Sequence, residues 1–328
     1  MFSIAPVPVT IVTGFLGAGK TTLVNRWLAD VPRGDVAVIV NEHGEVGIDG
    51  ALLAARVRTL VEISGGCVCC STQAELVRAL EELASAPSPP KRILVETSGA
   101  ASPAGVLRAV TGRGDTHVLD GVVTVIDATA LDDTLAEHDL AIEQVGFADV
   151  VILSRADRCA PEGLAHAEDV IAMHNGAALV VTAAAGELED PELATLEGLL
   201  DRRRADFRAR APSSSKAGHV YESVSLVLEG DIDGERFADF MESDLARFAG
   251  RLLRTKGILA VDGVAERMIV QGVADLVEVT FGEVWENKAR TSRLVVVGFG
   301  LDREALAGAF AACAADRETR ANAAMPSS

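Results

Sequence analysis

The sequence predicts an α/β protein with a doubly wound, mainly parallel sheet, followed by a second, smaller α+β domain. Three observations carry this prediction. Short apolar runs rich in β-branched residues recur through the first two thirds of the 328-residue chain and alternate with helical periodicity. A glycine-rich motif, GFLGAGKT, directly follows the first of these runs. A basic stretch that turns into a Ser-, Pro- and Ala-rich one, DRRRADFRARAPSSSKAG, precedes a last third with a different pattern.

The apolar runs are continuous rather than alternating, which is typical of parallel strands buried on both faces. Strands alternating with helices indicate a doubly wound domain, here expected over residues 1–204. The expected strands cover 7–13, 36–40, 92–97, 122–127, 149–154 and 178–182. The expected helices cover 21–30, 72–85, 161–174 and about 187–204.

The last third is expected to form a separate α+β domain over residues 219–315, after a linker at 205–218 and before a frayed tail at 316–328. HVYESVSLVLEG alternates like an antiparallel strand, and FADFMESDLARFA has the period of an amphipathic helix. Further strands are expected in RLLRTKGILAV, ERMIVQGV and SRLVVVGFG, and a closing helix in DREALAGAFAACAA.

The composition excludes several classes of protein. A hydrophobic content of 49% indicates a globular chain, and a formal net charge of −18 argues against nucleic acid as a partner. No apolar run reaches the ~18 residues that a membrane span needs, and the first residues lack a signal-peptide pattern. The protein is therefore expected in the cytoplasm. There an odd count of five cysteines indicates metal or redox chemistry rather than a disulfide framework.

GFLGAGKT at residues 14–21 fits the phosphate-loop pattern G-x-x-x-x-G-K-[ST]. Its glycines let the backbone curl so that N–H groups converge on phosphate oxygens, and the following helix adds its dipole. Lys20 is expected to reach the β and γ phosphates, and Thr21 to bind Mg²⁺. A glycine-rich turn without a ligand is the alternative, which the strand before the motif and the helix after it disfavour. The expected phosphate-side residues are Gly14, Gly17, Ala18, Gly19, Lys20, Thr21 and Thr22.

A phosphate loop needs an acidic group near its metal. Glu96 ends the expected strand RILVET, at the sheet edge where nucleotides bind, and is a candidate for the Mg²⁺ shell or for positioning water. It could also be only a solvated strand cap. NEHGEVGIDG at 41–50 is a second acidic segment, in a loop that could sense the γ-phosphate. Within it, Glu42 is a candidate Mg²⁺ ligand, and Glu45 joins Lys20 and Glu96 as a candidate catalytic residue.

Nucleotide choice is expected to depend on Ser154, Arg155 and Asp157, where GTPases usually carry Asn/Thr-Lys-x-Asp. The Asp157 carboxylate can accept hydrogen bonds from N1–H and the 2-amino group of guanine, whereas adenine offers no matching pair of donors. Arg155 could stack on the base as a lysine stem does. Ser154 looks too short to replace every contact of asparagine. GTP is therefore favoured over ATP.

Three of the five cysteines, Cys67, Cys69 and Cys70, lie within four positions in SGGCVCC. Thiolates are soft ligands for Zn²⁺, Cu⁺ and related ions, so this C-x-C-C motif is expected to bind a metal. A buried apolar cluster or a redox pair are the alternatives, and neither requires this spacing. Cys159 and Cys313 are expected to be packing residues. Candidates for a fourth ligand are Glu42, His43, Glu45, His117, water or a partner protein.

Taken together, TGFLGAGKTTL, NEHGEVGID, SGGCVCC and ETSGAASP resemble the CobW-like metal-binding GTPases, which are relatives of the urease and hydrogenase nickel-insertion GTPases. RLLRTKGIL, QGV and SRLVVVGFG resemble the C-terminal domain of that family. The resemblance implies a GTP- and Mg²⁺-dependent metallochaperone that binds Zn²⁺ or Co²⁺ through Cys67, Cys69 and Cys70. It also implies that Glu96 belongs to a Walker B-like strand and that residues 154–157 read guanine. The chain departs from the family pattern in SRAD, which replaces the usual Asn-Lys-x-Asp. It also lacks the histidine-rich tract that some members carry, and before the phosphate loop it lacks the Cys-Pro-containing client-docking motif of the family's eukaryotic zinc chaperones.

The favoured hypothesis is a slow GTPase that delivers its metal to a client metalloprotein or an enzyme of the cobalamin pathway. GTP and Mg²⁺ would order the loops and complete the thiolate site, and hydrolysis would release the ion. The alternatives are a P-loop small-molecule kinase with a structural zinc and a non-catalytic metal sensor or buffer. The oligomeric state stays open between a monomer and a dimer that depends on nucleotide or metal.

Overall fold

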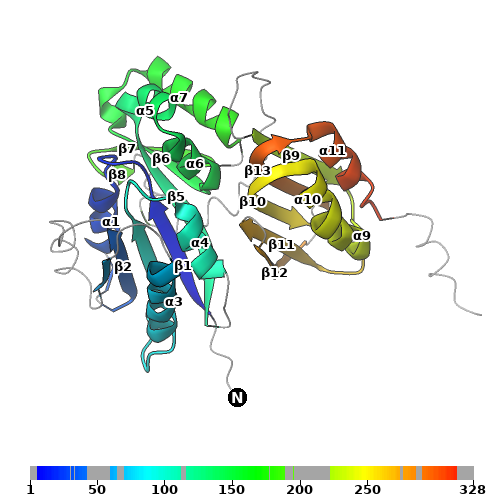
Figure 1. The fold of residues 1–328 in the computed structure, drawn as a ribbon, viewed down its shortest axis with the longest axis horizontal. Coiled ribbons are helices and arrows are strands. Elements are labelled where there is room, and N and C mark those ends of the chain that lie inside the picture. The colour runs from blue at the N-terminus through cyan, green and yellow to red at the C-terminus, as the bar shows by residue number, and fades with distance from the viewer. Residues whose placement is uncertain are drawn as a thin grey trace, which may run out of the picture. The chain divides into compact units, whose positions relative to one another are not determined.

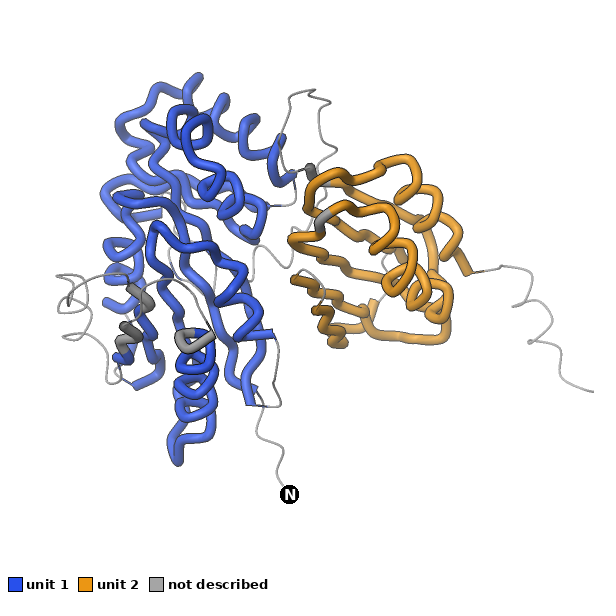
Figure 2. The backbone as a smooth tube through the Cα atoms, in the orientation of Figure 1, with its two compact units in different colours: residues 1–208 blue, residues 209–328 orange. Residues whose placement is uncertain are grey.

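The computed structural model contains two compact units, residues 1–208 and 209–328 (Figure 2). The predicted linker at 205–218 and tail at 316–328 lie outside the described residues. The structure describes residues 6–29, 31–32, 34–42, 60–64, 70–111, 116–176, 178–188, 195, 222–273, 276–285 and 290–315.

The first unit is built on a sheet whose described strands run in the order β3-β2-β4-β1-β5-β6-β7-β8 (Figure 1). All neighbouring pairs are parallel except β7 and β8. Because β1 lies in the interior, the loop that follows it opens at the middle of the carboxyl edge. The strands are β1 (Val7–Thr13), β2 (Val36–Glu42), β3 (Leu60–Ser64), β4 (Arg92–Thr97), β5 (His117–Asp127), β6 (Val150–Ser154), β7 (Leu179–Ala184) and β8 (Glu187–Leu188).

Helices cover both faces of this sheet, as expected for a doubly wound domain. On one face, Leu23, Val24 and Trp27 of α1 pack into a buried core with strand residues such as Val12 and Val125. On the other, α3, α4 and α6 contact β5, and α4 also contacts β1. The helical segments are α1 (Lys20–Ala29), α3 (Cys70–Ala84), α4 (Pro103–Thr111), η1 (Ala128–Ala130), α5 (Leu131–Glu137), α6 (Asp139–Phe147), η2 (Ala156–Arg158) and α7 (Pro161–His174).

The predicted parallel core is confirmed, with differences at its margins. Five of the six residues of β4 are buried, as a continuous apolar run requires. The helix predicted from about 187 is wrong at its start. There the chain reverses at Ala185 and Gly186, whose φ angles are 50° and 83°, and Glu187–Leu188 pairs antiparallel with β7. Residues 189–194 and 196–204 lie outside the described residues.

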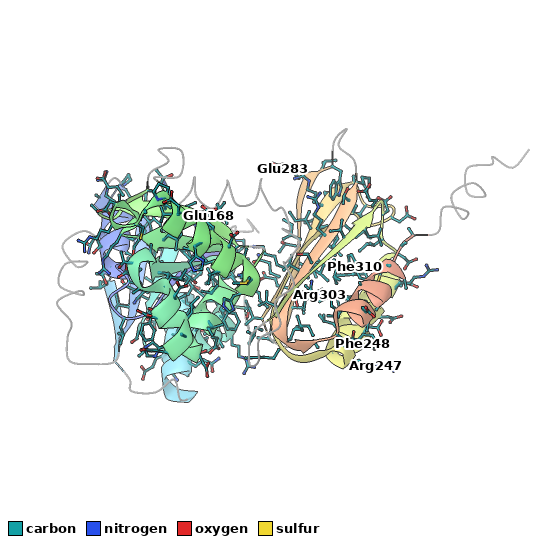
Figure 3. All side chains as sticks on the ribbon, turned by 90° about the horizontal axis from the view of Figure 1, so that it is seen from above. Glu168, Arg247, Phe248, Glu283, Arg303 and Phe310 are labelled. Atoms are coloured by element: carbon teal, nitrogen blue, oxygen red, sulfur yellow. The ribbon has the colours of Figure 1, made fainter. Side chains whose placement is uncertain are left out.

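The second unit contains an antiparallel sheet in the order β12-β11-β10-β13-β9. Phe237, Phe240 and Phe310 form an aromatic cluster in its core, with ring centroids 5.7 to 6.4 Å apart. Phe310 comes from α11, the helix that closes the unit (Figure 3). The strands are β9 (Glu222–Glu229), β10 (Ala249–Leu259), β11 (Glu266–Val273), β12 (Leu276–Val284) and β13 (Thr291–Leu301). The helical segments are α9 (Gly234–Asp239), η4 (Phe240–Asp244), α10 (Leu245–Phe248) and α11 (Arg303–Ala311).

Two features of this unit differ from the prediction. The single helix expected in FADFMESDLARFA is divided by the π-helical η4, and its last residue, Ala249, already belongs to β10. Strand β12 was not predicted. It lies at one edge of the sheet and leaves Val277, Val279 and Phe281 exposed on one side.

Candidate nucleotide and metal site

The loop between β1 and α1 curls around the start of the helix. Gly14, Gly17 and Gly19 have φ angles of 137°, 74° and 99°, a region that favours glycine. The buried Lys20 turns its ammonium group back into the loop, where Nζ donates to the carbonyl oxygens of Gly14 at 2.8 Å and Phe15 at 3.3 Å. The loop therefore places a positive charge at the sheet's carboxyl edge, beside backbone that can face phosphate.

Thr21 and Glu96 come together beside this loop. The Thr21 hydroxyl donates to Oε1 of Glu96 at 2.8 Å, and Glu96 is only 5% exposed. Glu96 sits near the end of β4, in register with Val12 of β1 and Val40 of β2, so two neighbouring strands fix its backbone. A hydroxyl and a carboxylate are the oxygen donors that Mg²⁺ prefers, so this pair fits that ion. Thr22 is exposed instead.

The segment after β6 is tied to the same loop. The Ser154 hydroxyl donates to the carbonyl of Ala18 at 2.7 Å and to that of Ile126 at 3.1 Å. Ser154 is therefore long enough to hold the phosphate-loop backbone, which its size alone did not indicate. Arg155, in the left-handed conformation with φ of 55°, pairs with Asp127 and donates to the Gly17 carbonyl at 2.9 Å.

Asp127 is a further residue of this site that the sequence did not predict, although it carries the same signal as Glu96: an acid at the carboxyl end of a central strand. Its Oδ1 caps η1 by accepting from the backbone N–H of Thr129 at 3.0 Å, while Oδ2 pairs with Arg155. Asp157, two residues after Arg155, is exposed in η2. The Asp127–Arg155 pair therefore sets the conformation of the segment from which Asp157 projects.

The metal motif lies only partly within the described residues. His43, Glu45, Asp49, Cys67 and Cys69 lie outside them. Glu42 ends β2 and is in register with Ser64, the last residue of β3, while Cys70 begins α3. The acidic segment and the cysteine motif therefore start from adjacent strand ends at the carboxyl edge, the edge on which Glu96 lies.

His117 lies far from this edge, which corrects its place among the candidate fourth ligands. It begins β5 at the amino edge, with Nδ1 3.1 Å from the Thr116 hydroxyl, and burial lowers the pKa of its imidazole despite the nearby Glu81 carboxylate. Glu81 and Cys70 are eleven residues apart on α3, which separates them by about 16 Å. Within the described ranges, no group of three or more His, Cys, Asp or Glu residues could hold a metal ion.

The two remaining cysteines lie in different surroundings. Cys159 is partly exposed after η2. Cys313 is buried, with Sγ 3.5 Å from the carbonyl oxygen of Ala309, and burial raises the pKa of its thiol to about 11. A thiol with such a pKa stays protonated at neutral pH, so Cys313 is a poor metal ligand. In the part of the chain that the structure describes, no helix is long and apolar enough to cross a membrane.

Comparison with known proteins matches both units to family models. Residues 8–182 match the CobW/HypB/UreG nucleotide-binding domain, and residues 221–314 match the cobalamin synthesis protein CobW C-terminal domain. The chain is 31% identical to the zinc chaperone YjiA of Escherichia coli, over 93% of this chain and 98% of that protein. It is 34% identical to the zinc chaperone CobW of Pseudomonas aeruginosa, over 94% of this chain and 91% of that protein.

Among solved structures, Zn(II)-bound YjiA GTPase from E. coli covers 95% of this chain and 100% of its own, with 25% identity and a TM-score of 0.67. The sequence resemblance is therefore confirmed in both units, by motif, by family model and by fold. The chain belongs to the CobW family, with the family's nucleotide-binding domain followed by its C-terminal domain.

Proposed function

We propose that this protein is a GTP-dependent zinc metallochaperone. It hydrolyses GTP to control the binding and release of a metal ion that Cys67, Cys69 and Cys70 hold for a client protein. Lys20 and residues 14–19 bind the phosphates, Thr21 and Glu96 hold Mg²⁺, and Asp157 reads the base. The relatives named zinc chaperones and the Zn(II)-bound YjiA GTPase support zinc as the cargo and GTP as the nucleotide.

One observation carries this proposal: the strand that leads into the cysteine segment ends at the same edge of the sheet as the strands that carry the nucleotide machinery. The segment with the cysteines leaves β3, whose register places Ser64 beside Glu42, and β2 is in turn paired with β4, which bears Glu96. Only β2 lies between β4, which bears Glu96, and β3, which leads into the cysteine segment. A loop rearrangement caused by the γ-phosphate therefore has a short path to the thiolates. Bound Mg²⁺ would neutralise phosphate charge at the Thr21–Glu96 pair.

Base selectivity is the first test. We expect GTP to bind more tightly than ATP, and Asp157→Asn to weaken GTP binding by about 5- to 150-fold, since a bidentate contact to a base contributes about 1–3 kcal/mol. ATP affinity should not change, because the carboxylate does not pair with adenine. Calorimetric titration of both nucleotides measures this. Asp132→Asn, on α5, is the matched control and should leave both affinities unchanged. Tighter binding of ATP by the unmodified protein would instead favour the kinase alternative.

Metal capture is the second test. We expect Cys69→Ser to weaken Zn²⁺ binding by more than about 100-fold, because loss of outer-shell contacts alone costs about 10- to 100-fold. GTP affinity should be retained. Competitive titration of Zn²⁺ and Co²⁺ with a chelator, with and without Mg·GTP, measures both the cargo preference and its coupling to nucleotide.

Cys159→Ser is the control for this titration, because Cys159 lies outside the motif. Equal Zn²⁺ affinity in Cys69→Ser and the unmodified protein would contradict the cargo site. Zn²⁺ affinity that ignores Mg·GTP would favour the sensor or buffer alternative.

A further inference from the structure

Helix α6 contacts the segment that follows Glu96. Gln144, on this helix, is 1% exposed, and its Nε2 lies 3.4 Å from the carbonyl oxygen of Gly99 and 3.4 Å from that of Ala101. The preceding residue, Glu143, accepts a hydrogen bond from the Ser102 hydroxyl at 2.7 Å. Two consecutive helix residues therefore hold the backbone and one side chain of the segment 99–102.

This segment lies directly against the phosphate loop. A Cβ added at Gly99 would lie 2.7 Å from the backbone N of Leu16 and 2.9 Å from its Cα. The two backbones are therefore too close together for a residue with a side chain at position 99. The residue before α6, His138, stacks on Phe15 of the phosphate loop with ring centroids 4.3 Å apart. The start of α6 therefore contacts one nucleotide loop, and its middle contacts the other.

The helix itself is fixed to the body of the domain. The Thr124 hydroxyl of β5 donates to the Gln144 carbonyl at 2.8 Å. At the end of α6, Nδ2 of the buried Asn175 donates to the carbonyl oxygens of Val145 and Ala148, at 2.8 Å each. Gln144 thus extends from a fixed support toward a segment that borders the phosphates.

The chemistry of Gln144 also indicates a role beyond packing. Its Oε1 is buried and makes no hydrogen bond to any of the described residues. An unsatisfied buried oxygen destabilises a fold, so a methionine or leucine would serve packing better at this position. A carboxamide supplies N–H donors to two carbonyl oxygens without adding a charge next to the phosphates.

We propose that Gln144 is a positioning residue for nucleotide hydrolysis, which holds Gly99 and Ala101 so that the segment after Glu96 stays against Leu16. This inference rests on the proposed function. Glu96 keeps its own place through β1, β2 and Thr21. Loss of the carboxamide should therefore disturb the arrangement around the γ-phosphate without weakening the contacts that hold the nucleotide.

The test compares Gln144→Met with Thr124→Val in steady-state GTP hydrolysis and GDP titration. Methionine has a similar volume and no N–H donor, so kcat should fall by about 10- to 100-fold, as a small misplacement near the reacting atoms can cause. KM for GTP and the Kd for GDP should change less than about twofold. Thr124→Val removes the hydroxyl that donates to the backbone carbonyl of Gln144 but leaves the carboxamide. Asn175 still holds α6 at Val145 and Ala148, so this variant should lower the Tm and leave kcat unchanged.

Gln144→Glu should give kcat a pH dependence that a packing role for Gln144 would not produce. When protonated, the carboxyl group donates an O–H to one of the carbonyl oxygens, and when ionised it repels both. Relative to the unmodified protein, its kcat should therefore rise as the pH falls, whereas that of Gln144→Met should not. An unchanged kcat in Gln144→Met, or an equal loss in Thr124→Val, would overturn the inference. If the unmodified protein hydrolyses no GTP, the proposed function fails as well, so the two failures are distinguishable.

Discussion

Replacing Gly14 by alanine is expected to abolish nucleotide binding and to destabilise the first unit strongly. The new Cβ would lie 2.1 Å from the carbonyl oxygen of Val125, and the backbone φ of 137° is strained for any residue with a side chain. Backbone strain of about 1–3 kcal/mol and overpacking of about 1–3 kcal/mol would both lower the free energy of unfolding. Moving residue 14 away from β5 also displaces the carbonyl that receives Lys20 Nζ. Thermal unfolding and GDP titration measure the two effects.

Gly163→Ala is the matched control for this substitution. Gly163 lies in α7, and a Cβ there would meet nothing within 4 Å. Alanine should therefore stabilise the protein by about 0.4–1 kcal/mol, because it reduces the conformational entropy of the unfolded chain. It should leave GDP affinity unchanged. A Gly14→Ala protein that folds normally and binds GDP with its original affinity would show that the phosphate loop is not built as described.

The second large effect is expected from Glu96→Gln, which should reduce GTP hydrolysis by about 10²- to 10³-fold, the range seen when one charge-stabilising group is removed from an active site. The amide oxygen can still accept from Thr21, so the hydrogen bond at 2.8 Å need not be lost. Single-turnover hydrolysis over a range of Mg²⁺ concentrations measures the loss, and the half-saturating Mg²⁺ concentration should rise.

Glu82→Gln, on the exposed surface of α3, controls for the loss of one negative charge and should leave both the rate and its Mg²⁺ dependence unchanged. Full activity in Glu96→Gln would remove this carboxylate from the proposed Mg²⁺ site. It would also mean that Thr21 does not share the binding of Mg²⁺ with Glu96.

The parts of the fold that were predictable are those whose local pattern agrees with their burial. Strand β4 is a continuous apolar run buried on both faces, and it delivers Glu96 to the edge where the sequence places it. Strand β3 is short and is followed by Gly-Gly-Cys, so its pattern has too few residues to be distinct. Glu187–Leu188 reads as the start of a helix by propensity, but the turn at Ala185 and Gly186 overrides it.

The candidate site likewise divides into residues that a local pattern indicates and residues that only the fold brings together. Residues within a contiguous motif, such as Lys20 and Thr21, can be found from spacing alone. Gln144 sits in AIEQVGF with no motif around it, and its partners Gly99 and Ala101 are more than 40 positions away along the chain. Only the packing of α6 against β5 brings them together, so no local pattern could have indicated the contact.

Strand β12 has a consequence for the behaviour of the protein in solution. Val277, Val279 and Phe281 are 47%, 47% and 61% exposed on an edge strand. The acidic side chains on that strand are Glu278 and Glu283, the second of which is labelled in Figure 3. Charges on an edge strand protect it against pairing with another copy, and the net charge of −18 adds repulsion between whole molecules. This protection is electrostatic, and its range shrinks from about 8 Å at physiological salt to about 3 Å at 1 M. Colloidal stability of this protein therefore decreases as salt is added, and low ionic strength is the condition that keeps it dispersed.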